Sequence, residues 1–141
     1  MEPHHTLVGF YIDEAVYAPL YYGYGGPGEY ADRAMHARRA EGQILEVAPD
    51  TVLVLLKASR DAIAARMKAD PHDLSLVKEK DIERVLEKFE QEYERSFLRR
   101  KFVLDSTDKT VEETLWDFVE QIQPHLTQAD RMRILTHLAL Q

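Results

Sequence analysis

Residues 51–57 read TVLVLLK, with five apolar side chains in an unbroken run between Thr51 and Lys57. An apolar run of this length that does not alternate with polar residues is typical of a strand buried on both faces of a parallel sheet. Ser59 follows the run and predicts the N-terminal cap of a helix that extends to about Ala69. A buried strand that leads directly into a helix is typical of α/β folds.

The residues after 69 predict one more strand and three more helices. Residues 79–98 carry apolar side chains at three- and four-residue steps, which indicates a helix with one buried face. Thr110 with Glu113 matches the capping-box pattern, and Thr127 with Asp130 suggests another helix start. We therefore expect a loop at residues 70–77, helices at residues 79–98, 111–123 and 128–140, and a strand at residues 101–104.

The residues before 51 predict one strand and two helices. The apolar, partly β-branched run HTLVGFYI is expected to form the first strand. Asp13 and Glu14 suit the N-terminus of a helix, and Pro19 bends or ends it. The expected elements are a strand at residues 5–12, helices at residues 13–22 and 29–47, a glycine-rich loop at residues 23–28 and a turn at residues 48–50.

Strands that alternate with helices predict an α/β fold, here three-layered, with a short parallel sheet of about three strands flanked by helices. The length of 141 residues suits a single domain. We expect this domain at residues 1–126 and a helical tail at residues 127–141. The tail is apolar enough to need a partner surface.

Composition and charge exclude several classes of protein. A formal net charge of −7 argues against sequence-independent nucleic-acid binding, which depends on a cationic surface. The chain has no cysteine for a disulfide or a thiolate zinc site, which fits the cytoplasm. It has no apolar run near the ~20 residues of a membrane span, and the start MEPHHT lacks the features of a signal peptide. We expect a cytoplasmic protein without a membrane or nucleic-acid partner.

Tyrosines are concentrated beside two acids near the N-terminus. Five of the seven tyrosines lie within residues 9–28, which also contain the adjacent Asp13 and Glu14. A core does not need so many phenols, because each buried hydroxyl requires a partner. An amphipathic aromatic wall beside a carboxylate predicts a pocket for a flat polar ligand.

The order and spacing of three segments resemble those of a known protein family. The segments are FYIDEAVYAPLYYG, then PDTVLVLLKAS followed by DAIAARMKAD, then KFEQEY followed by KFVLDSTDKTVEETLWDFVEQI. Over roughly residues 7–122 the chain resembles the C-terminal portion of P-loop nucleoside and nucleotide kinases of the thymidylate kinase-like group. The resemblance implies that Glu14 and Tyr17 contact the sugar and base of an acceptor nucleoside or nucleotide. It also implies that Arg66 is a lid arginine, in a lid region at about residues 66–80.

The chain departs from this family at the donor side. It contains no G-x-x-x-x-G-K-[ST] sequence, which in P-loop enzymes holds the phosphates and magnesium. Val8 and Gly9 occupy the places of the family's Asp-Arg pair. The sequence therefore predicts a truncated kinase fold that does not transfer phosphate from ATP alone, with Mg-ATP as donor only where an upstream phosphate loop exists. Because the missing strand is central in the family's sheet, we expect apolar strands to be uncovered and the chain to form a homo-oligomer.

Each candidate site residue also has a structural interpretation. Tyr17, Tyr21 and Tyr22 form either a base-stacking wall or packing at an interface. Glu14 is either a sugar acceptor or an acid at a helix start. The arginines can bind phosphate, but arginines more often pair with acids, of which the chain has 25; the phosphate candidates are Arg95, Arg99 and Arg100.

No metal site is predicted, because Asp13 and Glu14 are adjacent on a helix and do not face one another. No cofactor is predicted apart from the conditional Mg-ATP. The alternative function is a non-catalytic α/β module that acts through self-association or a protein partner.

Overall fold

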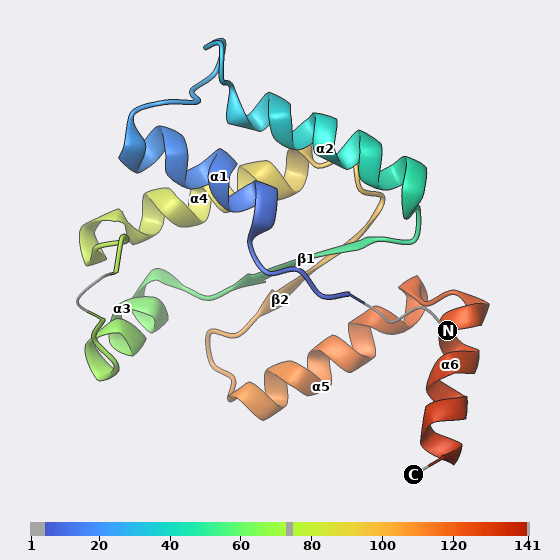
Figure 1. Ribbon diagram of the computed structural model, residues 1–141. Coiled ribbons are helices and arrows are strands. Elements are labelled where there is room, and N and C mark those ends of the chain that lie inside the picture. The colour runs from blue at the N-terminus through green and yellow to red at the C-terminus, as the bar shows by residue number, and fades with distance from the viewer. Residues whose placement is uncertain (1–4, 73–74, 141) are drawn as a thin grey trace.

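The computed structural model describes residues 5–72 and 75–140 (Figure 1). Its sheet has two parallel strands, β1 (Val52–Lys57) and β2 (Arg100–Asp105), in a register that places Lys57 opposite Asp105. The α/β class is therefore confirmed. The expected count of three strands is wrong, because the described part of the chain contains these two.

Six α-helices accompany the strands in the described residues. In the view of Figure 1, α1, α2 and α4 lie on one side of the strand pair, α5 lies on the other, and α6 runs away from the sheet. Their bounds are α1 (Phe10–Tyr17), α2 (Arg33–Val47), α3 (Arg60–Ala69), α4 (Ile82–Arg95), α5 (Val111–Ile122) and α6 (Gln128–Ala139). Short helical turns at Ala18–Tyr22, Glu79–Asp81 and Gln123–His125 extend or join them.

The strand predicted at residues 5–12 is wrong, because α1 begins inside it at Phe10. Gly9 and Phe10 have φ angles of 76° and 51°, in the left-handed region that interrupts an extended chain. A side chain at residue 9 would collide with the carboxylate of Asp13. Residues 5–8 are not hydrogen-bonded to either of the described strands. Local β propensity is therefore overridden by the turn at Gly9 and by the missing partner.

Most other boundaries follow local signals. α2 begins later than expected because Asp32 caps it, accepting a hydrogen bond from the Met35 amide at 3.0 Å. Ser59 caps α3 as predicted, and capping boxes begin α5 and α6. α4 ends at Arg95 instead of residue 98, because Ser96 is extended. Residues 73–74, within the predicted lid region 66–80, lie outside the described residues.

The core lies where α1, α2 and α4 meet, and around β2. Small side chains such as Ala18 and Ala37 allow the helices to approach closely, and Ile82 is buried at the start of α4. β1 is not buried on both faces as its sequence predicts: its residues are half-buried and Leu56 is 63% exposed. A strand with one hydrogen-bonded neighbour and incomplete helix cover cannot be fully enclosed. None of the helices among the described residues has the length and apolar character that crossing a membrane requires.

Candidate functional site

Arg66 lies at the C-terminal edge of the sheet, which we define as the ends of β1 and β2 with the following Ser106. The Arg66 guanidinium donates hydrogen bonds to the Ser106 carbonyl at 2.5 Å and to the Ser106 hydroxyl at 3.1 Å. The Ser106 amide donates in turn to the Lys57 carbonyl at 2.8 Å. These bonds fix a cation from α3 at the strand ends.

The loop after β2 is held by its own hydrogen bonds. The Asp105 carboxylate accepts bonds from the Thr107 hydroxyl at 2.5 Å and from the Thr107 amide at 2.9 Å. These two bonds keep the pKa of Asp105 below its usual value, so that the group stays ionised. The Thr107 hydroxyl also accepts from the Ser59 amide at 2.9 Å, which ties the loop to the start of α3.

Tyr17 packs on α4, next to the residue of α4 that contacts the end of β1. Its ring packs edge-on against Phe89, with ring centres 5.6 Å apart. The neighbouring Glu90 binds the Lys57 ammonium group at 2.7 Å, and this hydrogen bond raises the pKa of Lys57. Burial and then the charge of Asp13 raise the pKa of Tyr17. The structure thus brings Tyr17 and the end of β1 to one part of α4.

Glu14 faces α2 instead. Its carboxylate lies 3.4 Å from the Arg33 Nε atom, and the Arg33 guanidinium also lies over the Tyr24 ring, 5.2 Å from the ring centre. Glu14 is exposed, so this ion pair is in contact with solvent. Of the two adjacent acids, Asp13 is therefore the one whose charge acts on Tyr17.

The other tyrosines do not form an open wall. Tyr21 packs beside Tyr17, with ring centres 6.2 Å apart, whereas Tyr22 is 61% exposed. The cavity beside Tyr21, lined also by Asp81 and Arg84, has a volume of about 40 Å³. Such a space is near the size of one water molecule and cannot hold a nucleoside. Tyr21 therefore acts mainly as a packing group here.

The three phosphate-binding candidates do not converge. Arg100 donates to the His125 carbonyl at 3.0 Å and lies 3.4 Å from the Asp50 carboxylate. Arg99 is exposed on the segment before β2. Arg95 lies at the end of α4, 3.9 Å from the Glu92 carboxylate. Arg66 is thus the one arginine among the candidates that lies at the C-terminal edge.

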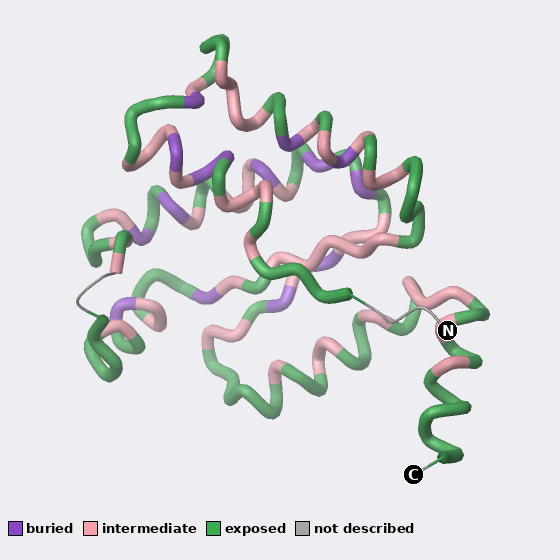
Figure 2. The backbone as a smooth tube through the Cα atoms, in the orientation of Figure 1, coloured by how far each residue is buried: buried purple, intermediate pink, exposed green. Residues whose placement is uncertain are grey.

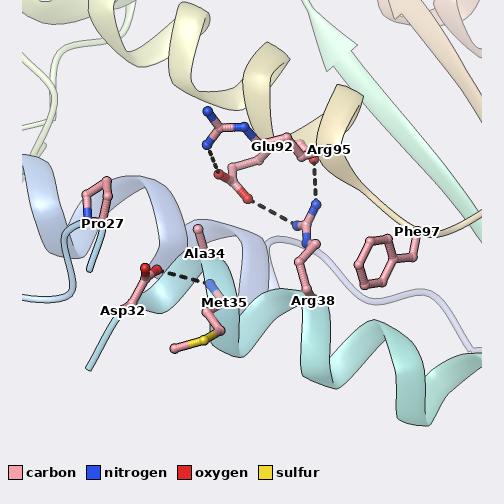
Figure 3. A pocket seen from close by; sticks show the side chains of 8 residues that line it. All are labelled: Pro27, Asp32, Ala34, Met35, Arg38, Glu92, Arg95 and Phe97. Carbon is pink, nitrogen blue, oxygen red and sulfur yellow. Dashed lines mark hydrogen bonds and ion pairs between the residues drawn. The ribbon is translucent and has the colours of Figure 1, made fainter. Parts of the chain in front are cut away.

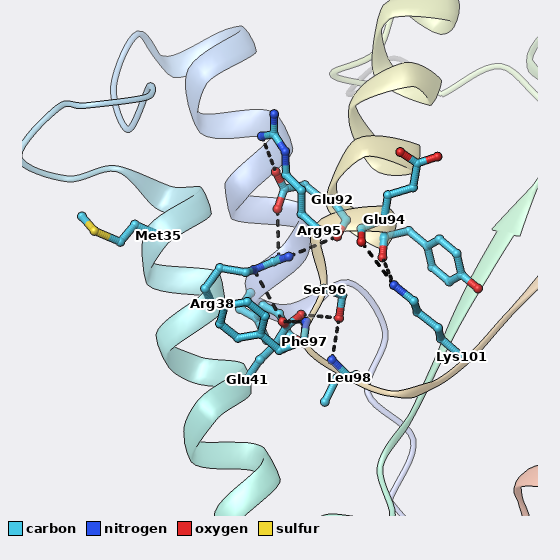
Figure 4. Close-up of polar contacts among 12 residues, drawn as sticks. Met35, Arg38, Glu41, Glu92, Glu94, Arg95, Ser96, Phe97, Leu98 and Lys101 are labelled. Atoms are coloured by element: carbon cyan, nitrogen blue, oxygen red, sulfur yellow. Dashed lines mark hydrogen bonds and ion pairs between the residues drawn. The ribbon is translucent and has the colours of Figure 1, made fainter.

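A buried polar network that the sequence analysis missed joins α1, α2 and the end of α4 (Figure 4). Glu41 is completely buried and accepts hydrogen bonds from Tyr11 Oη at 3.1 Å, Ser96 Oγ at 2.8 Å and the Phe97 amide at 2.7 Å. Arg38, one turn earlier on α2, donates to a Glu92 carboxylate oxygen at 3.1 Å and to the Glu92 carbonyl at 3.3 Å. The network therefore fixes where α4 ends and where the chain turns toward β2.

Beside this network, a hollow of about 440 Å³ lies between the start of α2 and the end of α4 (Figure 3). Its wall includes Arg38, Glu92, Arg95 and the half-exposed ring of Phe97. The volume falls within the usual range for small-molecule sites. However, the hollow lies before the start of β2, away from Arg66, and Arg38 is already bonded to Glu92. We therefore regard it as part of the scaffold.

Neither a metal site nor a known relative indicates the function of the described part of this chain. Within residues 5–72 and 75–140, no group of three or more His, Asp or Glu side chains is arranged to hold a metal ion. No protein-family model, curated protein or solved structure matches this chain significantly. The geometry at the C-terminal edge is therefore the main indication of function.

Proposed function

We propose that this chain binds a nucleoside or nucleotide at the C-terminal edge of β1 and β2, as the acceptor and lid portion of a P-loop kinase-like fold. The observation that carries the proposal is the position of Arg66, fixed by two hydrogen bonds to Ser106 beside both strand ends. The guanidinium has further N–H groups that can donate hydrogen bonds to a phosphate oxygen. Because the side chain is already oriented, less conformational entropy is lost when an anion binds.

Tyr17 and Glu14, both on α1, form the nucleoside side of this proposal. Tyr17 is half-buried against Phe89, so that its ring has a fixed position beside α4. Glu14 is paired with Arg33 across 3.4 Å, in an exposed ion pair of the kind worth about 0–1 kcal/mol. Exchanging that pair for a sugar hydroxyl therefore costs little.

The chain does not transfer phosphate by itself in this proposal. Phosphoryl transfer from ATP requires a cradle of backbone amides, a lysine and a hydroxyl that hold the phosphates and magnesium. The sequence of 141 residues contains no G-x-x-x-x-G-K-[ST] that could supply them. The residues at the C-terminal edge would bind and orient an acceptor.

Calorimetric titration of the full chain with thymidine, thymidylate and ATP tests the proposal. We expect thymidylate to bind more tightly than thymidine, because Arg66 contacts the phosphate. Arg66→Gln should weaken thymidylate binding about tenfold or more, the value of a hydrogen bond to a charged group, and leave thymidine binding unchanged. Arg99→Gln, also an exposed arginine, is the matched control. No saturable heat at millimolar ligand, or equal effects of the two substitutions, would refute the proposal.

The second candidate is a non-catalytic module that acts by self-association. The specific observation in its favour is the apolar surface of the last two helices. Leu115 and Trp116 on α5 are 58% and 67% exposed, and Leu135 and Leu138 on α6 are 60% and 61% exposed. This apolar surface and the proposed nucleotide site lie on different parts of the chain, so that self-association and nucleotide binding can occur together.

A further inference from the structure

The last two helices each present an apolar face to solvent. On α5, Phe118 packs toward Phe102 of β2, with ring centres 6.0 Å apart, while other apolar side chains point away from the sheet. The exposed ones are Val111, Leu115, Trp116 and Val119 on α5 and Met132, Ile134, Leu135 and Leu138 on α6. Neither helix contains a buried residue, and Figure 2 shows α6 as exposed along almost its whole length. Exposed apolar side chains grouped on two successive helices indicate an interaction surface.

Contacts with the rest of the chain hold the turn between α5 and α6. That turn is bound to the body of the protein: the His125 ring stacks on Phe102, with ring centres 5.4 Å apart, and its carbonyl accepts from Arg100 at 3.0 Å. Arg131 of α6 donates to the Gln123 carbonyl at 2.5 Å, which fixes the direction in which α6 leaves. As Figure 1 shows, this direction is away from the sheet.

The two helices have opposite charge. α5 carries four acidic side chains and no basic one: Glu112, Glu113, Asp117 and Glu120. Glu113 belongs to the capping box of α5 and Asp117 is paired with Lys109, which leaves Glu112 and Glu120 for a partner helix. α6 carries two arginines, Arg131 and Arg133, and one acid, Asp130, so that its net charge is +1. Asp130 belongs to the capping box of α6 and also lies 3.7 Å from the Arg133 guanidinium. Opposite charges beside matching apolar faces favour contact between α5 and α6, and the four acids of α5 disfavour contact between two α5 helices.

We propose that two copies of this chain form a dimer by exchanging their C-terminal helices, with α6 of each copy packed on α5 of the other. Both helices have 12 residues and therefore a length of about 18 Å, so that the faces can overlap fully. The contact is two-fold symmetric, and each copy both supplies and receives a helix. The dimer covers apolar side chains that a monomer leaves in water.

Cross-linking identifies which helices meet. Because the chain has no cysteine, Leu115→Cys and Leu135→Cys each introduce a single reactive thiol on an exposed position. A mixture of the two variants, treated with a short bis-maleimide, should give an adduct that links residue 115 of one copy to residue 135 of the other. A mixture of Leu115→Cys with Tyr30→Cys is the control, since Tyr30 is fully exposed in a loop far from both helices in sequence. Adducts that link only residue 135 to residue 135 would refute the exchange.

Sedimentation velocity over a range of concentrations tests the dimer without cross-linking. Leu138→Glu adds a charge to the apolar face of α6 and should raise the dimer dissociation constant at least about tenfold, because a leucine no longer leaves water. Tyr30→Glu makes the same charge change outside the face and should have no effect. A monomer at all concentrations, or equal weakening by both substitutions, would overturn the proposal. Circular dichroism of each variant confirms that its helices are intact.

Discussion

Replacement of Glu41 by alanine should destabilise the fold more than any other single acid-to-alanine change on α2. Glu41 is fully buried and accepts hydrogen bonds of 2.7–3.1 Å from Tyr11, Ser96 and Phe97. Its removal leaves the Phe97 amide and the buried Ser96 hydroxyl without this acceptor, at about 1–3 kcal/mol for each unsatisfied buried group. It also leaves a cavity and removes a negative charge 3.5 Å from Arg38.

We expect the free energy of unfolding to fall by about 3–5 kcal/mol, the range for breaking a buried charged network. This is a large share of the roughly 5–15 kcal/mol that stabilises a typical domain. Glu41→Gln keeps the shape and one acceptor oxygen, so that it should cost only about 1–3 kcal/mol.

Urea unfolding followed by circular dichroism at 222 nm measures these changes, provided that the slope of the transition is the same for each variant. Glu46→Ala is the matched control, because Glu46 lies on the same helix and is exposed. Exposed positions usually change stability by less than about 0.5 kcal/mol. If Glu41→Ala costs no more than Glu46→Ala, the network does not hold α2 to the end of α4.

Three further predictions concern stability. Burial raises the pKa of four tyrosines: Tyr11, Tyr17, Tyr21 and Tyr93. As the pH rises, the unfolded state therefore loses these protons before the folded state does, and the free energy of unfolding should fall above about pH 10. Urea unfolding at pH 9 and at pH 11 measures this difference. Gly9→Ala should lower the free energy of unfolding by about 1–3 kcal/mol, since φ is 76° and the added carbon meets the Asp13 carboxylate. Gly28→Ala is the control and should lower it less, because φ is 77° there but the space around the residue is open. Thr110→Ala removes the capping box of α5 and should lower stability by about 1 kcal/mol in thermal unfolding, with Thr136→Ala, a mid-helix threonine of α6, as control.

The parts of the fold that the sequence predicts are those with a local cause. β1 and β2 follow from short apolar runs, and Ser59 and Thr110 start helices because their side chains accept hydrogen bonds from nearby amides. These signals act within four residues and do not depend on the rest of the chain. The bounds of α3 and α5 were therefore predictable to within a residue or two.

The parts that the sequence analysis missed depend on distant contacts. Residues 5–12 have β propensity, but a strand also needs a neighbour, and the turn at Gly9 starts a helix instead. Glu41 was missed because carboxylates are usually exposed. Its position four residues after the buried Ala37 places it on the core-facing side of α2, and this spacing was the available signal. Its partners Ser96 and Phe97 are 55 and 56 residues away, too far for a local pattern to reveal.

Nucleotide binding at the C-terminal edge is the central claim, and amide NMR spectra of the ¹⁵N-labelled chain during titration with thymidylate test it most directly. We expect saturable shifts at Arg66, Ser106 and Thr107, with smaller shifts near Tyr17, and none in the hollow around Arg95. Unchanged spectra at millimolar thymidylate, or shifts confined to the hollow, would contradict the account.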